Sequence, residues 1–91
     1  MRVSEAALND VVRRAVASVD GVQLRKSRRR LGVELDGGRA RAELQLAVEY
    51  GRVLPEVSAA VQERVAAMLV RTFDVEVEAI DVTVEQLERA R

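Results

Sequence analysis

The sequence predicts an α+β fold, a two-layer sandwich in which two helices cover one face of a mixed or antiparallel four-stranded sheet. Three observations support this prediction. Apolar residues recur at helical spacing near the start of the chain, they alternate over Arg39–Tyr50 and Val75–Val84, and a second helical pattern opened by Pro55 lies between those two segments. The expected order is therefore α-β-β-β-α-β, in a single domain over residues 1–91.

The first helix is expected to begin after Ser4, a good helix N-cap, with the acid Glu5 in its first turn. Its apolar residues repeat at intervals of three and four, which predicts one buried stripe. The stripe consists of Leu8, Val11, Val12, Ala15, Val16 and Val19. Asp20-Gly21 should end the helix, because glycine adopts the left-handed conformation without strain.

Three strands should follow the first helix. Val22–Lys26 predicts a short strand, and alternation of Leu31, Val33 and Leu35 predicts a second. The third strand is expected over Arg39–Tyr50.

A hairpin should join the second strand to the third. Its turn is Asp36-Gly37-Gly38, and tight hairpin turns need residues at positive φ. Along the third strand, apolar side chains face one way and polar ones the other, which is the pattern of one buried and one wet face. The inward set is expected to be Ala40, Ala42, Leu44, Leu46, Val48 and Tyr50.

The second helix is expected to start near Pro55, whose missing N–H costs nothing in a first turn, and to end near Phe73-Asp74. No Ser, Thr, Asp or Asn stands at its expected N-cap. In the last strand, Val75, Val77 and Ala79 have one parity and Ile80, Val82 and Val84 the other. Both sets can face inward only with a β-bulge near Ala79-Ile80. Residues 85–91 are expected to form a polar tail or a helical turn.

Composition excludes several kinds of function. The chain is 48% apolar and contains neither Cys nor His, so it lacks a thiolate nucleophile, a disulfide framework and the usual neutral-pH proton shuttle. The longest apolar run is Val65–Val70, far shorter than the roughly 20 residues of a membrane-spanning helix. Net charge is zero, but a basic run near residue 28 contrasts with an acidic C-terminal end.

Several segments, taken in order, resemble the alkaline shock protein family, a bacterial envelope stress response domain. They are V-D-G-V at 19–22, V-E-Y-G at 48–51, P-E-V-S-A-A-V-Q-E-R-V at 55–65 and V-E-V-E-A-I-D-V-T-V at 75–84. The resemblance spans roughly Val3 to Val84. It implies a small non-enzymatic cytoplasmic protein concerned with cell-envelope homeostasis, and some members are held at the membrane by a separate small membrane protein. The resemblance implies no catalytic residue.

Two surfaces are candidate partner-binding sites. One is the basic run formed by Arg25, Lys26, Arg28, Arg29 and Arg30. Such a run binds phosphate, anionic lipid head groups or an acidic partner, or it is simply a solvated turn. The other is the wet sheet face, formed by Arg41, Glu43, Gln45, Glu76 and Glu78. If the third and fourth strands pair, opposite charges would meet across them, and an uncovered face or edge could bind a partner or a second copy.

Other site chemistries find little support in the sequence. A serine nucleophile would have no histidine base, Glu76 and Glu78 fit a wet strand face better than an acid/base pair, and no loop has calcium-ligand spacing. Nucleic-acid binders of this architecture stack bases on aromatics or use a Gly-x-x-Gly loop. The only aromatics here, Tyr50 and Phe73, fit core positions. We therefore expect no catalytic residue, no metal site, no cofactor and no nucleic acid.

These observations predict a non-enzymatic protein-interaction domain, a scaffold or adaptor in the envelope stress response, with the function resting on the resemblance. The expected partner is a protein, with a small membrane-anchored protein as one candidate and self-association as another. The expected location is the cytoplasm, or the membrane periphery through a partner. The alternatives are a soluble regulator that binds a metabolic enzyme complex and, third, a small nucleic-acid-binding module.

Overall fold

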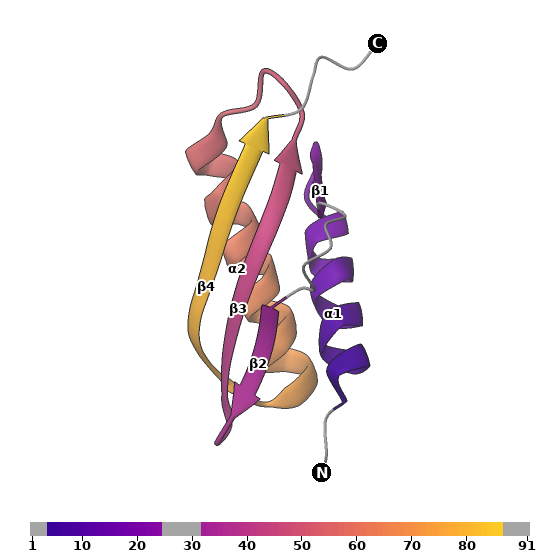
Figure 1. Cartoon of the computed structure of the whole chain (residues 1–91), viewed down its shortest axis with the longest axis vertical. Coiled ribbons are helices and arrows are strands. Elements are labelled where there is room, and N and C mark those ends of the chain that lie inside the picture. The colour runs from indigo at the N-terminus through magenta and orange to yellow at the C-terminus, as the bar shows by residue number, and fades with distance from the viewer. Residues whose placement is uncertain (1–3, 25–31, 87–91) are drawn as a thin grey trace.

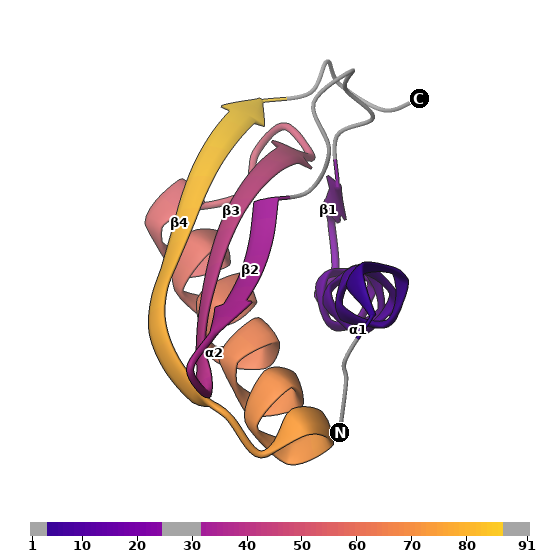
Figure 2. The same cartoon turned by 60° about the horizontal axis from the view of Figure 1, so that its bottom comes forward.

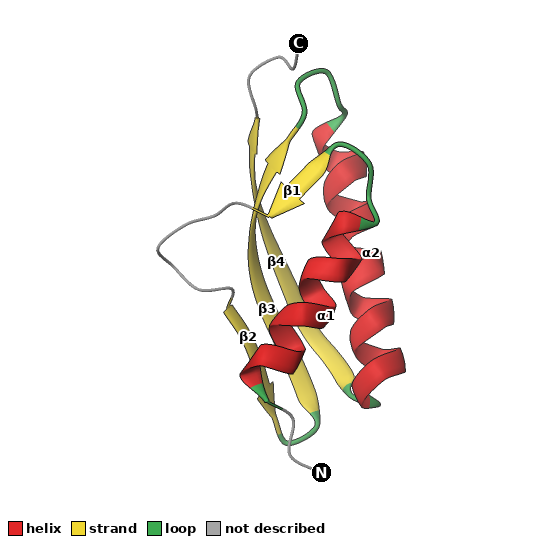
Figure 3. Cartoon of the chain, turned by 90° about the vertical axis from the view of Figure 1, so that its right-hand side faces the viewer, coloured by secondary structure: helices red, strands yellow, loops and turns green. Residues whose placement is uncertain are grey.

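A computed structural model describes residues 4–24 and 32–86 of the chain. Its elements are α1 (Glu5–Ala17), β1 (Val22–Leu24), β2 (Gly32–Asp36), β3 (Arg39–Val48), α2 (Leu54–Phe73) and β4 (Glu76–Gln86). This is the expected α-β-β-β-α-β order (Figure 1). Both helices lie on one face of the sheet, which confirms the two-layer sandwich (Figure 3).

The sheet is mixed, and β3 is its centre. β1 and β2 pair with β3 antiparallel, at Leu46–Val48 and Arg39–Glu43 respectively, whereas β4 pairs with β3 in parallel over Arg39–Val48. A strand has only two edges, so β1 and β2 share one edge of β3 and β4 occupies the other. β4 is consequently an outermost strand (Figures 1 and 2).

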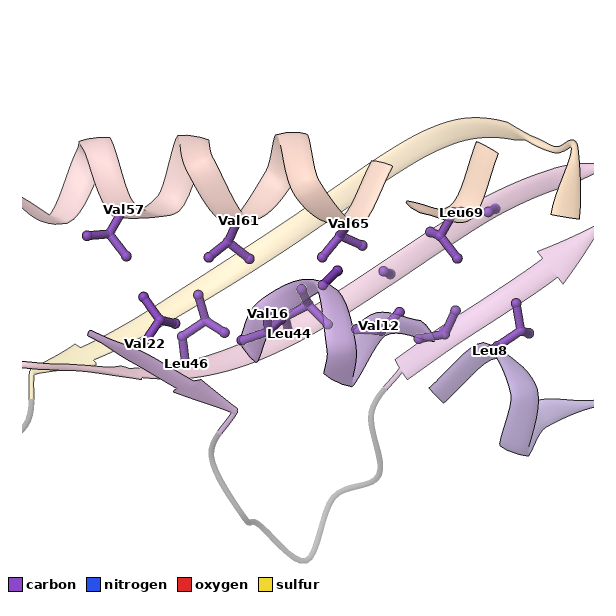
Figure 4. Packing of buried hydrophobic residues seen from close by; sticks show 14 of the residues in the cluster. Leu8, Val12, Val16, Val22, Leu44, Leu46, Val57, Val61, Val65 and Leu69 are labelled. Atoms are coloured by element: carbon purple, nitrogen blue, oxygen red, sulfur yellow. The ribbon is translucent and has the colours of Figure 1, made fainter. Parts of the chain in front are cut away.

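The core is a layer of aliphatic side chains between the sheet and the two helices (Figure 4). From α2 it receives a row at every fourth position, Val57, Val61, Val65 and Leu69. From α1 it receives Leu8, Val12, Ala15 and Val16, while Val11 and Val19 at the sides of the predicted stripe are partly buried. Among the described residues, no polar or charged residue is buried, so burial of aliphatic surface holds the layers together.

The helix ends follow the sequence signals except at the end of α1, which stops at Ala17 with Ser18 as its C-cap, before the predicted Asp20-Gly21. The Ser4 hydroxyl accepts a hydrogen bond from the Ala7 N–H at 3.0 Å, as a helix N-cap should. At the start of α2, Val53 is the N-cap and supplies no side-chain hydrogen bond, and Pro55 stands in the first turn. The helix ends where Asp74 takes a left-handed conformation, with φ of 53°.

Two turns depend on glycine. Gly37 and Gly38 have φ of 58° and 79°, which produces the tight hairpin between β2 and β3. Gly21, at φ of 75°, lies under the side chain of Arg52, and a Cβ at this position would be only 2.6 Å from Arg52 Nε. Gly21 therefore allows the turn before β1 to pack against the loop after β3.

The predicted β-bulge is present, and its position differs slightly from the expectation. Val77 pairs with Ala40 and Ala79 with Arg41, so Glu78 is the extra residue. After it, Ile80, Val82 and Val84 align with the inward residues of β3, as predicted. Ala79, expected to face inward, instead lies in register with the outward-facing Arg41. β4 also continues to Gln86, whereas the sequence predicted a tail or helical turn from residue 85.

Tyr50 does not occupy the core position that alternation predicts. Its exposed fraction is 54%. β3 ends at Val48, the Glu49 N–H donates to the Gly21 carbonyl at 2.8 Å, and the chain turns at Tyr50-Gly51. Tyr50 therefore lies beyond the end of β3, where the alternation of inward and outward side chains no longer applies. Phe73 is partly buried against the core.

Candidate protein-interaction surface

The face of the sheet turned away from the helices is the main candidate surface, and we call it the outer face. Its charged residues and one glutamine come from β2, β3 and β4, and they are all exposed. They are Glu34, Asp36, Arg39, Arg41, Glu43, Gln45, Glu76, Glu78 and Asp81. Near the other end of β3, Ala47 is 7% exposed, so the wet part of the face extends over the earlier two thirds of the strand.

The register of the strands arranges these charges in rows. Asp36 on β2 is opposite Arg39 on β3, and Arg39 is in turn opposite Glu76 on β4. In the next row, Glu34 is opposite Arg41, beside the bulge at Glu78. Arg39 therefore lies between two carboxylates. Arg41 has Glu34 on one side and, on the other, Ala79 next to the bulge residue Glu78.

These contacts are loose. Arg39 Nε lies 3.9 Å from a Glu76 carboxylate oxygen, and both side chains are largely exposed. Ion pairs of this kind contribute little to stability in water. Around them the surface forms an open depression of about 520 Å³, lined by Glu34, Asp36, Gly37, Arg39, Arg41 and Glu78. The charged side chains are therefore accessible to a partner and contribute little to the stability of the sheet.

One row breaks the alternation of charge. Glu43 on β3 is in register with Asp81 on β4, and both are exposed. Like charges directly opposite each other destabilise a sheet. Counted over the outer face as defined, six carboxylates stand against two guanidinium groups. The face therefore has a net negative charge that a basic partner would neutralise.

The structure brings together half of the candidate residues that the sequence indicated. Arg41, Glu43, Gln45, Glu76 and Glu78 all lie on the outer face, and β3 and β4 do pair. The basic run of Arg25, Lys26, Arg28, Arg29 and Arg30 lies outside the described residues. Whether either surface binds anything stays a prediction.

Sequence reasoning missed Glu34, Asp36, Arg39 and Asp81. For three of them a signal existed. The Asp36-Gly37-Gly38 turn fixes the hairpin register, which puts Asp36 opposite Arg39 and Glu34 opposite Arg41. Asp81 was harder to place, because its face depends on where in β4 the bulge falls.

The described residues give little basis for other kinds of site. No group of three or more His, Cys, Asp or Glu residues among them could hold a metal ion. Within the same residues, no helix is both long and apolar enough to cross a membrane. With its charged sheet face outward and its core closed by two helices, the fold defines a small α+β domain with an accessible charged surface.

Family comparison assigns this domain more closely. The model of the alkaline shock protein family, described by its cell envelope-related function, matches residues 22–89. The chain belongs to this family, which confirms the resemblance found in the sequence. No curated protein matches the chain in sequence.

Solved structures share the fold. A MamM CTD variant in its zinc form is similar with a TM-score of 0.70 and 22% identity, over 91% of this chain and 86% of that chain. A second MamM CTD variant, in its copper form, has a TM-score of 0.69 and 22% identity, over 93% of this chain and 100% of the other. At this identity the likeness concerns the fold alone.

Proposed function

We propose that this chain is a non-enzymatic protein-interaction domain that acts as an adaptor in the cell-envelope function of its family, at the cytoplasmic side of the membrane and through a protein partner. The observation that supports the proposal best is the outer face. It is uncovered by any described element and rich in carboxylates, and its one ion pair between described residues is loose, so a partner can bind it without disturbing the core.

The charge of the outer face also favours a protein partner over nucleic acid. A phosphate backbone is attracted by clusters of Arg and Lys. Here both arginines of β3 have an acid opposite them on β2, and the face has six carboxylates. A basic protein segment matches this surface, whereas a phosphate backbone is repelled by it.

The test is a pull-down of the tagged chain from detergent-solubilised membranes of its source organism. One variant reverses charges on the outer face, Glu43→Lys with Asp81→Lys. A matched control makes the same change in net charge at exposed positions of α2, Glu56→Lys with Glu63→Lys. A third variant replaces Arg28, Arg29 and Arg30 with Ala, which tests the basic run.

The proposal expects one integral membrane protein that is recovered by the unmodified chain and by the α2 control, and lost by the outer-face variant. Loss in the arginine variant alone would place the contact on the basic run and overturn the role of the outer face. Recovery of soluble enzymes only, by all variants, would favour the regulator of a metabolic complex and overturn the adaptor function.

A further inference from the structure

The free edge of β4 is the longest strand edge without a described strand partner. β4 runs for 11 residues, and among the described elements its only strand partner is β3. Its other edge faces outward (Figure 1). An edge of this length presents N–H and C=O groups that pair readily with another extended chain, unless charges, bulges or a covering element prevent it. On β4 the bulge lies near the start, at Glu78, which leaves the later part of the edge regular.

One side chain of α2 already binds this edge. Gln62 Nε2 donates a hydrogen bond to the Ile80 carbonyl at 2.9 Å, in an exposed position. An exposed carbonyl that accepts from a helix side chain points away from β3. Because the N–H and C=O groups of successive residues point to opposite edges of a strand, Ile80, Val82 and Val84 turn these groups to the free edge. Gln62 thus occupies one of the places that an incoming strand would use.

The side chains along this edge differ on the two faces of the sheet. On the inner face, Ile80, Val82 and Val84 are only partly buried, because no further strand shields them. On the outer face, Glu76, Glu78 and Asp81 are exposed acids. A strand that paired here would place every second side chain beside aliphatic residues and the others beside carboxylates.

Charge complementarity then decides which strand fits. β4 contains four acidic residues and no basic one, so two copies paired through this edge would bring like charges together. The fold already shows the complement that β4 accepts, because β3 pairs with its first part through Arg39-Ala40-Arg41-Ala42, in which arginines face outward and alanines inward. Across β2, β3 and β4 the charges run acid, base, acid. A further strand beside β4 would continue this order if it carried basic residues.

We propose that the free edge of β4 binds an extended segment of a partner protein in which basic residues alternate with aliphatic ones. The aliphatic side chains cover Ile80, Val82 and Val84, and the basic ones neutralise Glu78 and Asp81 on the outer face. Neutralising Asp81 also relieves its repulsion with Glu43. This assignment rests on the proposed adaptor function and names the chemistry of its partner.

The experiment uses the purified full chain and synthetic peptides, so it does not depend on recovering an envelope protein. The probe is acetyl-Arg-Val-Arg-Val-Arg-Val-Arg-amide, and its affinity is measured by calorimetry. One control peptide has Glu at every Arg, and another has the same composition with all arginines before all valines. The first control tests charge, and the second tests alternation.

Two charge-matched variants locate the contact. Glu78→Lys with Asp81→Lys changes the edge strand, whereas Glu34→Lys with Asp36→Lys makes the same change on β2, at the opposite side of the outer face. The proposal expects binding to weaken by about ten-fold or more in the β4 variant, since reversed charges repel the peptide, and to change little in the β2 variant. Gln62→Ala should bind more tightly, because it frees the Ile80 carbonyl.

Amide hydrogen exchange provides the readout that surface charge alone would not produce. The Ile80, Val82 and Val84 amides should exchange more slowly when the alternating peptide is bound. Equal binding of the block peptide, equal loss in both charge variants, or no protection of these amides would overturn the edge assignment. So would a stable dimer in sedimentation with the same amides protected in the absence of peptide. The adaptor function could still pass its own membrane pull-down in each of these cases, so the two proposals fail separately.

Discussion

The two faces of β3 have one backbone and opposite properties. On the inner face Ala40, Ala42, Leu44, Leu46 and Val48 are at most 2% exposed. On the outer face Arg39, Arg41, Glu43 and Gln45 are all exposed. The inner side chains are constrained by volume, because they fill a close-packed layer, and the outer ones by charge. Residues constrained by volume and residues constrained by charge are thus one step apart along the strand, and substitutions at neighbouring positions should distinguish them.

The largest contrast should come from truncating neighbouring side chains on opposite faces. Leu44→Ala removes a side chain that is 1% exposed, and we expect it to lower the free energy of unfolding by about 2–5 kcal/mol. Gln45→Ala, one residue further along, should change it by about 0.5 kcal/mol or less. Urea denaturation measures both values. Similar losses at the two positions would contradict the separation of the faces.

A smaller contrast is expected from adding volume. Ala42 is 2% exposed and lies in register between Val33 and Ile80. Ala42→Leu should therefore cost about 1–3 kcal/mol through overpacking. Gln45→Leu adds an aliphatic side chain on the outer face and serves as the control, with an unchanged denaturation midpoint expected. A variant at Ala42 as stable as the parent would show that the inner layer has unfilled space.

A change of charge on the outer face should raise the free energy of unfolding, whereas the two inner-face substitutions lower it. Glu43→Lys replaces a like-charge pair with an opposite-charge pair opposite Asp81, and we expect a gain of about 0.5 kcal/mol in the free energy of unfolding. The gain should shrink in high salt, because exposed charges are screened. Gln45→Lys, opposite Thr83, should give no comparable gain. Thermal unfolding at two ionic strengths measures these changes. A lower stability of Glu43→Lys than of the parent would contradict the proximity of the two acids.

The smallest effect should come from the ion pair between Arg39 and Glu76. Its atoms are 3.9 Å apart and both side chains are largely exposed, so Arg39→Ala should cost no more than about 0.5 kcal/mol. The comparison variant is Glu76→Ala, which should behave alike. If chemical denaturation showed a loss as large as that of Leu44→Ala, the outer face would be structural, and the contrast between the two faces would be lost.

Much of the fold could be predicted because its signals are local. The helical stripes, the Ser4 cap, the two-glycine hairpin and the parity change in the last strand each depend on a few adjacent residues. Tyr50 was misplaced because alternation does not show where a strand ends, and here the last pairing hydrogen bond runs from Glu49 to the distant Gly21. The sharing of one edge of β3 by β1 and β2 likewise depends on pairing between distant segments.

The candidate surface was predictable only within single strands. Alternation assigned Arg41, Glu43 and Gln45 to a wet face, and the structure places them there. What alternation could not provide is the row across the strands, such as Glu43 beside Asp81, because that contact requires both the parallel pairing and the position of the bulge. The sequence did not predict that β4 has a free edge, because that too depends on how the strands pair.

The central position of β3 has a consequence for the order in which the chain folds. Every described strand pair includes β3. During synthesis, α1, β1, β2 and β3 emerge first and can assemble through antiparallel contacts between segments that are closer in sequence than β3 and β4 are. The parallel pairing with β4 must wait until α2 has also been made, and contacts between distant segments form slowly. Until then one edge of β3 is open, so β4 is the strand that completes the sheet.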